Sequence, residues 1–126
     1  MTGPACRNRE PDVRLLFVCS RNRLRSPTAE RIFAVIPGVE CESAGVAPDA
    51  ENPLTPELIE WAELVLVMES AHRAKVTRVF PTALRNKRVV SLDIPDEYEF
   101  MDSELIPLLW ERVSRFVPAV QTARAR

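Results

Sequence analysis

The residues best able to do chemistry in this sequence are a cysteine and an arginine six positions apart, with a serine directly after the arginine. They are Cys19, Arg25 and Ser26. A cysteine thiolate is a strong nucleophile, and the planar guanidinium of arginine can bind two phosphate oxygens at once. The Ser26 hydroxyl can donate a hydrogen bond to the sulfur. The set predicts attack by Cys19 on a phosphate ester that Arg25 holds.

The backbone between these residues is expected to bind the phosphate. A short loop between a buried strand and a helix start directs its N–H groups at one point, where the helix dipole adds positive charge. The same field favours the thiolate of Cys19. We expect inorganic phosphate or sulfate to bind in this loop, at Ser20, Arg21, Asn22, Arg23, Leu24 and Arg25. The alternative is a buried structural cysteine beside a solvated cluster of arginines.

Apolar runs and helix signals alternate along the chain and must position these residues. Strands are expected near residues 15–19, 39–43, 64–68 and 88–92. Ser26 and Thr55, each followed by proline, are typical of helix N-caps, and a last helix is expected from Ser103 to about Val117. This order predicts an α/β fold of three α/β/α layers with a four-stranded parallel sheet, flavodoxin-like, that binds ligands at the carboxyl ends of its strands.

The composition narrows the function further. The 126 residues suit one domain, which we expect over residues 13–122 after a flexible tail over residues 1–12. A net charge of −1 argues against a nucleic-acid partner. No apolar run reaches the ~20 residues of a membrane span. Three cysteines without a C-x-x-C pair indicate a reducing compartment, so we expect a cytoplasmic protein.

The segment around Cys19 closely resembles the signature of the low-molecular-weight protein tyrosine phosphatases. The similarity lies in Leu16-Phe17-Val18-Cys19, in Asn22 and in Arg25-Ser26-Pro27-Thr28-Ala29-Glu30, with further likeness in Glu42–Gly45, Leu54–Leu58 and Val65–Glu69. The resemblance implies phosphomonoester hydrolysis through a cysteinyl-phosphate, without a metal or other cofactor. It implies a phosphorylated protein or a small phosphomonoester as substrate, with a protein tyrosine phosphatase as the first expectation.

The resemblance also implies a general acid on a loop after the last strand. The family has an Asp-Pro pair there, usually followed by aromatic residues, and Asp96 and Tyr98 match the acid and an aromatic. Tyr98 and Arg23 are therefore expected to contact the substrate. Glu97 replaces the proline of the pair, and Asp93 and Asp102 remain alternatives as the acid. A merely solvated acidic loop is also possible.

The sequence departs from the family's pattern and resembles a shortened, variant member. Arg21 stands where the family has a glycine, and Leu24 where it often has a second cysteine. The segment from residue 45 to 55 is shorter, which predicts a more open site. Arg21 and Arg23 at its rim are expected to favour acidic peptides. Without the second thiol, oxidation of Cys19 by peroxide is expected to be poorly reversible.

Two other functions remain open from the residues. One is a phosphate- or phosphopeptide-binding module with little or no turnover, which Glu97 and the shortened segment would suit. The other is a thiol-coupled arsenate reductase, which would need more cysteines near Cys19 than Cys6 and Cys41 supply. His72 is expected at the surface, on a polar helix face, without a catalytic role.

Overall fold

The central sheet is built from the apolar runs of the sequence. The computed structural model describes residues 13–125, and its strands are β1 (Val13–Cys19), β2 (Val39–Gly45), β3 (Leu64–Val67) and β4 (Arg88–Ser91). All neighbouring strands pair in parallel, in the order β2-β1-β3-β4. The central strand β1 is buried from Leu15 to Cys19, because helices cover both faces of the sheet. The expected four-stranded parallel sheet is confirmed.

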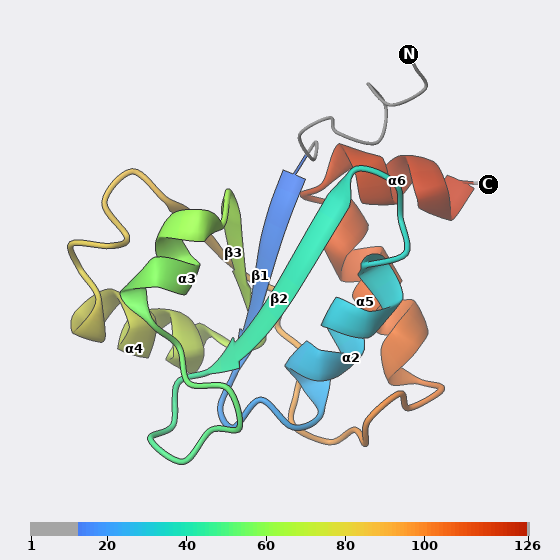
Figure 1. Ribbon diagram of the computed structural model, residues 1–126. Helices are drawn as coiled ribbons and strands as arrows, with labels where there is room; N and C mark the ends of the chain where they lie inside the picture. The colour runs from blue at the N-terminus through green and yellow to red at the C-terminus, as the bar shows by residue number, and fades with distance from the viewer. Residues whose placement is uncertain (1–12, 126) are drawn as a thin grey trace.

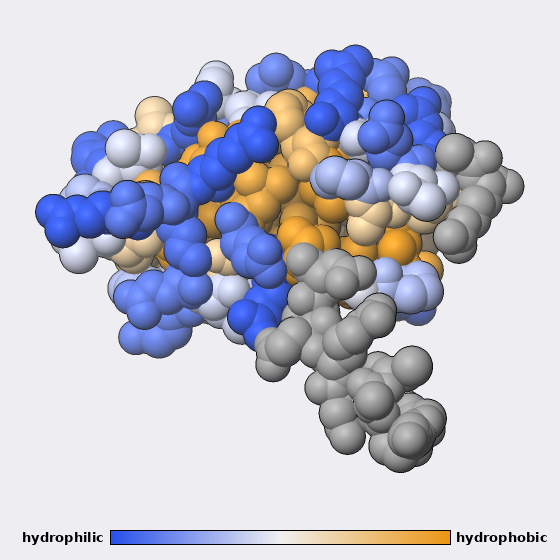
Figure 2. All heavy atoms as spheres, turned by 90° about the horizontal axis from the view of Figure 1, so that it is seen from above, coloured by the Kyte–Doolittle hydropathy of each residue, from blue (hydrophilic) through white to orange (hydrophobic). Residues whose placement is uncertain are grey.

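Helices form a layer on each side of this sheet (Figure 1). One face carries α2 (Arg25–Phe33), α5 (Leu105–Ser114) and α6 (Pro118–Ala125), and the other carries α3 (Pro56–Trp61) and α4 (Ser70–Val79). Side chains of β1 alternate between the two faces, so Phe17 packs under α2 while Val18 packs under α3 and α4. Seen from above, hydrophobic residues gather in the middle, between hydrophilic residues (Figure 2). The three-layer α/β/α architecture is confirmed.

Two expected helix boundaries are wrong. The predicted last helix, from Ser103 to about Val117, corresponds to α5, which ends at Ser114. A further helix, α6, was not predicted; it begins at Pro118, whose missing N–H is tolerated in the first turn of a helix. α6 runs past the expected domain end at residue 122, and the expected tail over residues 1–12 lies outside the described residues. Ser26 does not cap α2, since the helix begins at Arg25 and Leu24 occupies the cap position without a side-chain hydrogen bond.

The order of the elements brings loops from distant parts of the sequence to one edge of the sheet. Because all strands are parallel, the segments that follow β1, β2, β3 and β4 meet at their carboxyl ends, at the bottom of Figure 1.

Among the described residues, no helix is both long and apolar enough to cross a membrane.

Candidate active site

The loop predicted to bind phosphate, residues 19–25 (the phosphate-binding loop), turns back on the sulfur of Cys19. The backbone N–H of Asn22 donates to Cys19 Sγ at 3.2 Å, and Asn22 has a φ of 59°. Asparagine tolerates this left-handed conformation better than most residues, so Asn22 suits this turn of the loop. Arg21, at the family's glycine position, is not among the described residues with positive φ. Arginine at that position therefore costs no backbone strain.

Ser26 connects Asn22 to the sulfur. Its side chain is fully buried, with Oγ 2.9 Å from Cys19 Sγ. The Asn22 side-chain amide donates to Ser26 Oγ at 3.0 Å. Because the amide occupies a lone pair of this oxygen, the hydroxyl proton is free to point at the sulfur. Cys19, itself only 4% exposed, thus receives a hydrogen bond from Ser26 and one from the backbone.

Arg25 is held at the base of the loop by the segments that follow β3 and β4. Its side chain is 3% exposed, and Nη1 donates to Glu69 Oε1 and to the Ile94 carbonyl, both at 2.7 Å. Charge-assisted bonds of this kind fix a guanidinium in one orientation. Within the described residues, Nη2 of Arg25 has no protein partner. It is available to a phosphate oxygen.

A cavity of about 530 Å³ opens over this loop. Its lining residues are Cys19, Ser20, Arg21, Arg23, Leu24, Arg25, Ala47 and Asp96. Within the described residues, the backbone N–H groups of Arg21, Arg23 and Leu24 donate to no protein acceptor. Unpaired N–H groups beside a helix start and a buried arginine make an anion-binding site. A thiol, a guanidinium and a carboxylate, those of Cys19, Arg25 and Asp96, therefore line one cavity.

His72 is buried, so the expectation that it lies at the surface is wrong. Its side chain is buried, and Nε2 lies 2.9 Å from Ser20 Oγ. The Glu69 backbone N–H donates to Nδ1 at 3.1 Å, so the neutral ring carries its proton on Nε2 and donates it to Ser20. Burial, and secondarily the charge of Arg25, lowers the pKa of His72 below its ordinary value. This neutral imidazole therefore positions Ser20, the second residue of the loop.

Of the candidate acids, Asp96 alone lines the cavity. Its Oδ1 is 3.7 Å from Arg25 Nε, and its side chain is 67% exposed. Asp93 instead accepts a hydrogen bond from Ser91 Oγ at 2.9 Å and lines a separate surface hollow. Asp102 accepts the backbone N–H of Glu104 at 2.9 Å and so stabilises the turn before α5. The geometry favours Asp96 as the residue that can exchange a proton with a bound ester.

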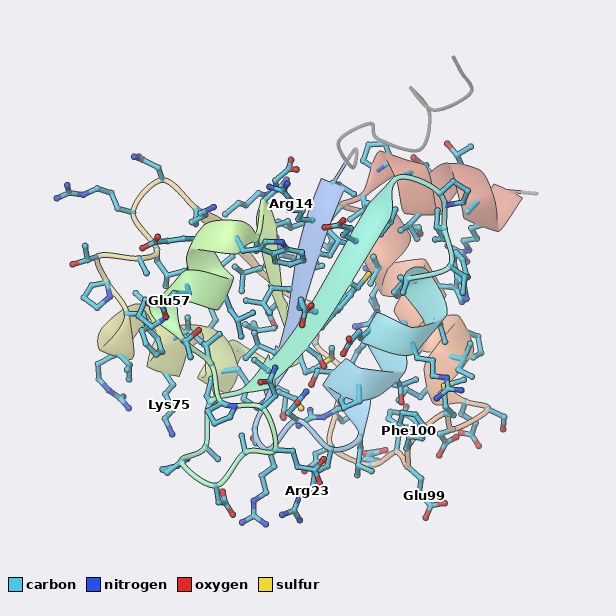
Figure 3. All side chains as sticks on the ribbon, viewed as in Figure 1. Arg14, Arg23, Glu57, Lys75, Glu99 and Phe100 are labelled. Carbon is cyan, nitrogen blue, oxygen red and sulfur yellow. The ribbon has the colours of Figure 1, made fainter. Side chains whose placement is uncertain are left out.

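The aromatic residue expected over the substrate lies elsewhere. Tyr98 is partly buried and packs against the core beneath α2 and α5, and it does not line the cavity. Leu24 is 37% exposed at the cavity wall, and Phe100 is 44% exposed in the segment between β4 and α5 that also carries Asp96. Figure 3 shows Phe100 at the same end of the sheet as Arg23. Stacking by Tyr98 therefore stays a prediction, which the packing of its ring does not favour.

Both rim arginines pair with carboxylates of the segment after β2. Arg21 Nε lies 3.8 Å from Asp49 Oδ2, and Arg23 Nε lies 3.6 Å from Glu51 Oε1. All four side chains are more than half exposed, so these pairs add little stability. They do offset the positive charge of the rim, and this argues against the expected preference for acidic peptides.

The described cysteines cannot form a disulfide with each other. Cys41 pairs with Leu15 and Gly45 pairs with Cys19, so the two cysteines are offset by four residues along neighbouring strands. At ~3.3 Å per residue this is roughly 13 Å, beyond the ~7 Å that a disulfide tolerates. Burial, together with Glu30 and Glu42, raises the pKa of Cys41 to about 12. The resolving thiol of a thiol-coupled arsenate reductase is thus absent from the described residues; Cys6 lies outside them.

Sequence reasoning missed Glu69 and His72. Glu69 lies two residues after the end of β3, at the edge where parallel strands bring their ligand-binding ends together. The position after β3 was the available signal, because an acid there lies beside the loop that follows β1. His72 carried no such signal, since it lies in the first turn of α4 rather than at the end of a strand.

Comparison with known proteins agrees with this geometry. The family model described as "Low molecular weight phosphotyrosine protein phosphatase" matches residues 14–104. The low molecular weight protein-tyrosine-phosphatase Etp of Escherichia coli K12 is 32% identical, over 67% of this chain and 76% of that protein. A protein-arginine-phosphatase of Geobacillus stearothermophilus is 34% identical, over 56% of this chain and 64% of that protein.

Solved structures share the fold. The YwlE arginine phosphatase from Geobacillus stearothermophilus superposes with a TM-score of 0.66 at 27% identity, covering 90% of this chain and 96% of that one. The tyrosine phosphatase Wzb from Escherichia coli K30, in complex with phosphate, superposes with a TM-score of 0.67 at 24% identity, covering 82% and 95%. The flavodoxin-like fold expected from the sequence is confirmed.

Proposed function

Because the chain belongs to the low molecular weight phosphotyrosine protein phosphatase family, it is a cysteine-based phosphatase, and we propose that it hydrolyses phosphotyrosine in proteins with Cys19 as the nucleophile. The observation that carries this proposal is the sulfur of Cys19, bonded by Ser26 and Asn22 at the base of a cavity that also holds Arg25 and Asp96. Inorganic phosphate, the product, is expected to bind in the same loop, as sulfate would.

The first step forms a cysteinyl-phosphate. The Cys19 thiolate attacks phosphorus while Arg25 and the free N–H groups of the loop bind the non-bridging oxygens. The bond between phosphorus and the ester oxygen breaks, and the Asp96 carboxyl donates its proton to the leaving phenolate. General acid catalysis of this kind contributes typically about 10²–10⁴-fold.

The second step releases phosphate. A water molecule attacks the phosphorus of the cysteinyl-phosphate, and the Asp96 carboxylate accepts its proton. The sulfur–phosphorus bond breaks and the electron pair returns to Cys19, where the Ser26 hydroxyl stabilises the thiolate. Asp96 is again a protonated carboxylic acid at the end, so the enzyme returns to its starting state. Since Cys19 must stay reduced throughout, we place this reaction in a reducing compartment, the cytoplasm.

Phosphotyrosine is proposed over phosphoarginine because of the family's description and the wall of the cavity. Leu24 presents an exposed apolar side chain beside the phosphate-binding loop, which suits a phenyl ring better than a charged guanidinium. The test is phosphate release from matched peptides that carry phosphotyrosine, phosphoarginine or phosphoserine. We expect kcat/KM to be highest for phosphotyrosine, and a higher value for phosphoarginine would overturn the assignment.

Two variants test the residue roles with p-nitrophenyl phosphate. Cys19→Ser should abolish turnover. Asp96→Asn should slow hydrolysis of alkyl phosphates far more than that of the activated aryl ester, which needs little protonation of its leaving group. Phosphate binding by the wild type without phosphate release would instead favour the binding-module alternative.

A further inference from the structure

The segment after β2 is joined directly to the phosphate-binding loop. This segment, residues 46–55, is called the β2–α3 loop here. The backbone N–H of Val46 donates to the Cys19 carbonyl at 3.0 Å, and that of Ala47 donates to the Ser20 carbonyl at 2.8 Å. A substrate whose phosphate is bound by the loop at residues 19–25 therefore lies beside the β2–α3 loop.

A second pocket lies on the other side of this segment, between it and α4. Its volume is about 290 Å³, and we call it the loop–helix pocket. Its lining residues are Gly45, Val46, Ala47, Pro48, Pro53 and Leu54 from the β2 side and Lys75, Val76, Val79 and Phe80 from α4. Apart from Lys75, every lining residue is apolar or glycine. Ala47 also lines the cavity over Cys19, so the two hollows share a wall.

The size and position of the pocket select its occupant. A volume of this size is at the lower limit of ligand sites and accommodates one large apolar side chain. An extended peptide advances about 3.3–3.6 Å per residue, and Ala47 lines both hollows. A residue close to the phosphotyrosine in sequence can therefore reach this pocket. Lys75 can cover such a side chain with its methylene stem while its ammonium stays in water.

The charges around the cavity also favour an apolar residue beside the phosphotyrosine of the substrate. Arg21 and Arg23 are already paired with Asp49 and Glu51 of the β2–α3 loop, so an acidic residue of a substrate would have to compete with carboxylates of the protein. An apolar neighbour meets no such competition. In Figure 3, Arg23 and Lys75 extend at the same end of the molecule, the end where the substrate must bind.

We propose that the loop–helix pocket is a specificity subsite that binds an apolar side chain of the phosphorylated substrate, within three residues of the phosphotyrosine. This inference rests on the proposed function and deepens it. The β2–α3 loop thus selects an apolar rather than an acidic sequence context. It does so by neutralising the two rim arginines and by forming one wall of the subsite.

The test uses the full chain and phosphotyrosine peptides of otherwise constant sequence. Leucine, alanine or glutamate is placed in turn at each of the three positions on either side of the phosphotyrosine. We expect kcat/KM for leucine to exceed that for alanine about tenfold at one position, the lower end of what an apolar pocket discriminates. Equal values at all positions, or a preference for glutamate, would overturn the proposal.

Variants identify the pocket that is responsible. Val79→Arg changes a half-exposed lining residue and should remove the leucine preference while hydrolysis of p-nitrophenyl phosphate stays unchanged. Val35→Arg is the matched control, because Val35 is 80% exposed and follows α2 on the opposite face of the sheet. It should alter neither measurement. A leucine preference that survives Val79→Arg would refute the assignment to this pocket.

Binding to an inactive variant separates this inference from the proposed function. Cys19→Ser should bind the leucine peptide about tenfold more tightly than the alanine peptide, as measured by calorimetric titration. This result would support the subsite even if the wild type released no phosphate, which would count against the proposed function alone. Equal affinities for the two peptides would reject the subsite whether or not the enzyme turns over.

Discussion

Replacing Ser26 with alanine should slow the second half of the reaction more than the first. The hydroxyl lies 2.9 Å from Cys19 Sγ and is oriented by the amide of Asn22. It stabilises a thiolate, and the thiolate regains full charge only when the sulfur–phosphorus bond breaks. Attack in the first step consumes that charge, so losing the hydroxyl does not slow it in the same way.

The magnitude follows from the kind of hydrogen bond that is lost. A bond to a charged group contributes about 1.5–3 kcal/mol, and each ~1.4 kcal/mol changes a rate tenfold. Hydrolysis of the cysteinyl-phosphate by Ser26→Ala should therefore be about 10- to 150-fold slower. Asn22 Nδ2 also loses its acceptor in a buried position, which should cost about 1–3 kcal/mol of unfolding free energy.

Rapid-quench or stopped-flow assays with p-nitrophenyl phosphate measure both effects. Ser26→Ala should give a burst of p-nitrophenolate equal to the enzyme concentration, followed by a slow steady state. Asn22→Gly is the matched control, because glycine accepts the φ of 59° and the Ser26 hydroxyl remains, so its kcat should fall less. If Ser26→Ala loses kcat without a burst, or keeps wild-type kcat, the assigned role of this hydroxyl is wrong.

Three further outcomes follow from the packing around the loop. Gly45→Ala would put a methyl group 2.6 Å from the Ser20 carbonyl, so we expect a loss of about 1–3 kcal/mol in urea unfolding and a lower kcat. Because the pKa of His72 is lowered in the fold, its contribution to stability is complete above pH 6.5 and is lost as the pH falls below that value. His72→Gln should lack this part of the acid destabilisation. Identical curves of unfolding free energy against pH for the wild type and His72→Gln would contradict this. Peroxide should oxidise Cys19 beyond recovery by dithiothreitol, since Cys41 is roughly 13 Å away; mass spectrometry that finds a disulfide between them would disprove this.

The sequence determined the elements and the reactive centre because the signals for both are local. An unbroken apolar run predicts a strand buried on both faces, and β1 is such a strand. The distance from Cys19 to Arg25 spans one loop, and Asn22 has the residue type that accepts a left-handed turn. The identity of the nucleophile, the phosphate-binding loop and the fold class could therefore be predicted without any contact between distant residues.

Only the tertiary structure decided what surrounds that loop. Arg25 is bonded to Glu69 and Ile94, 44 and 69 residues away in sequence, and Ser20 is bonded to His72, 52 residues away. Such contacts depend on the order β2-β1-β3-β4, which brings the ends of parallel strands together although no local pattern records which side chains meet. From the sequence, the polar face of α4 and the run of acids after β4 would both be expected to lie in solvent. Packing buries the histidine of that face and brings one of those acids, Asp96, to the cavity.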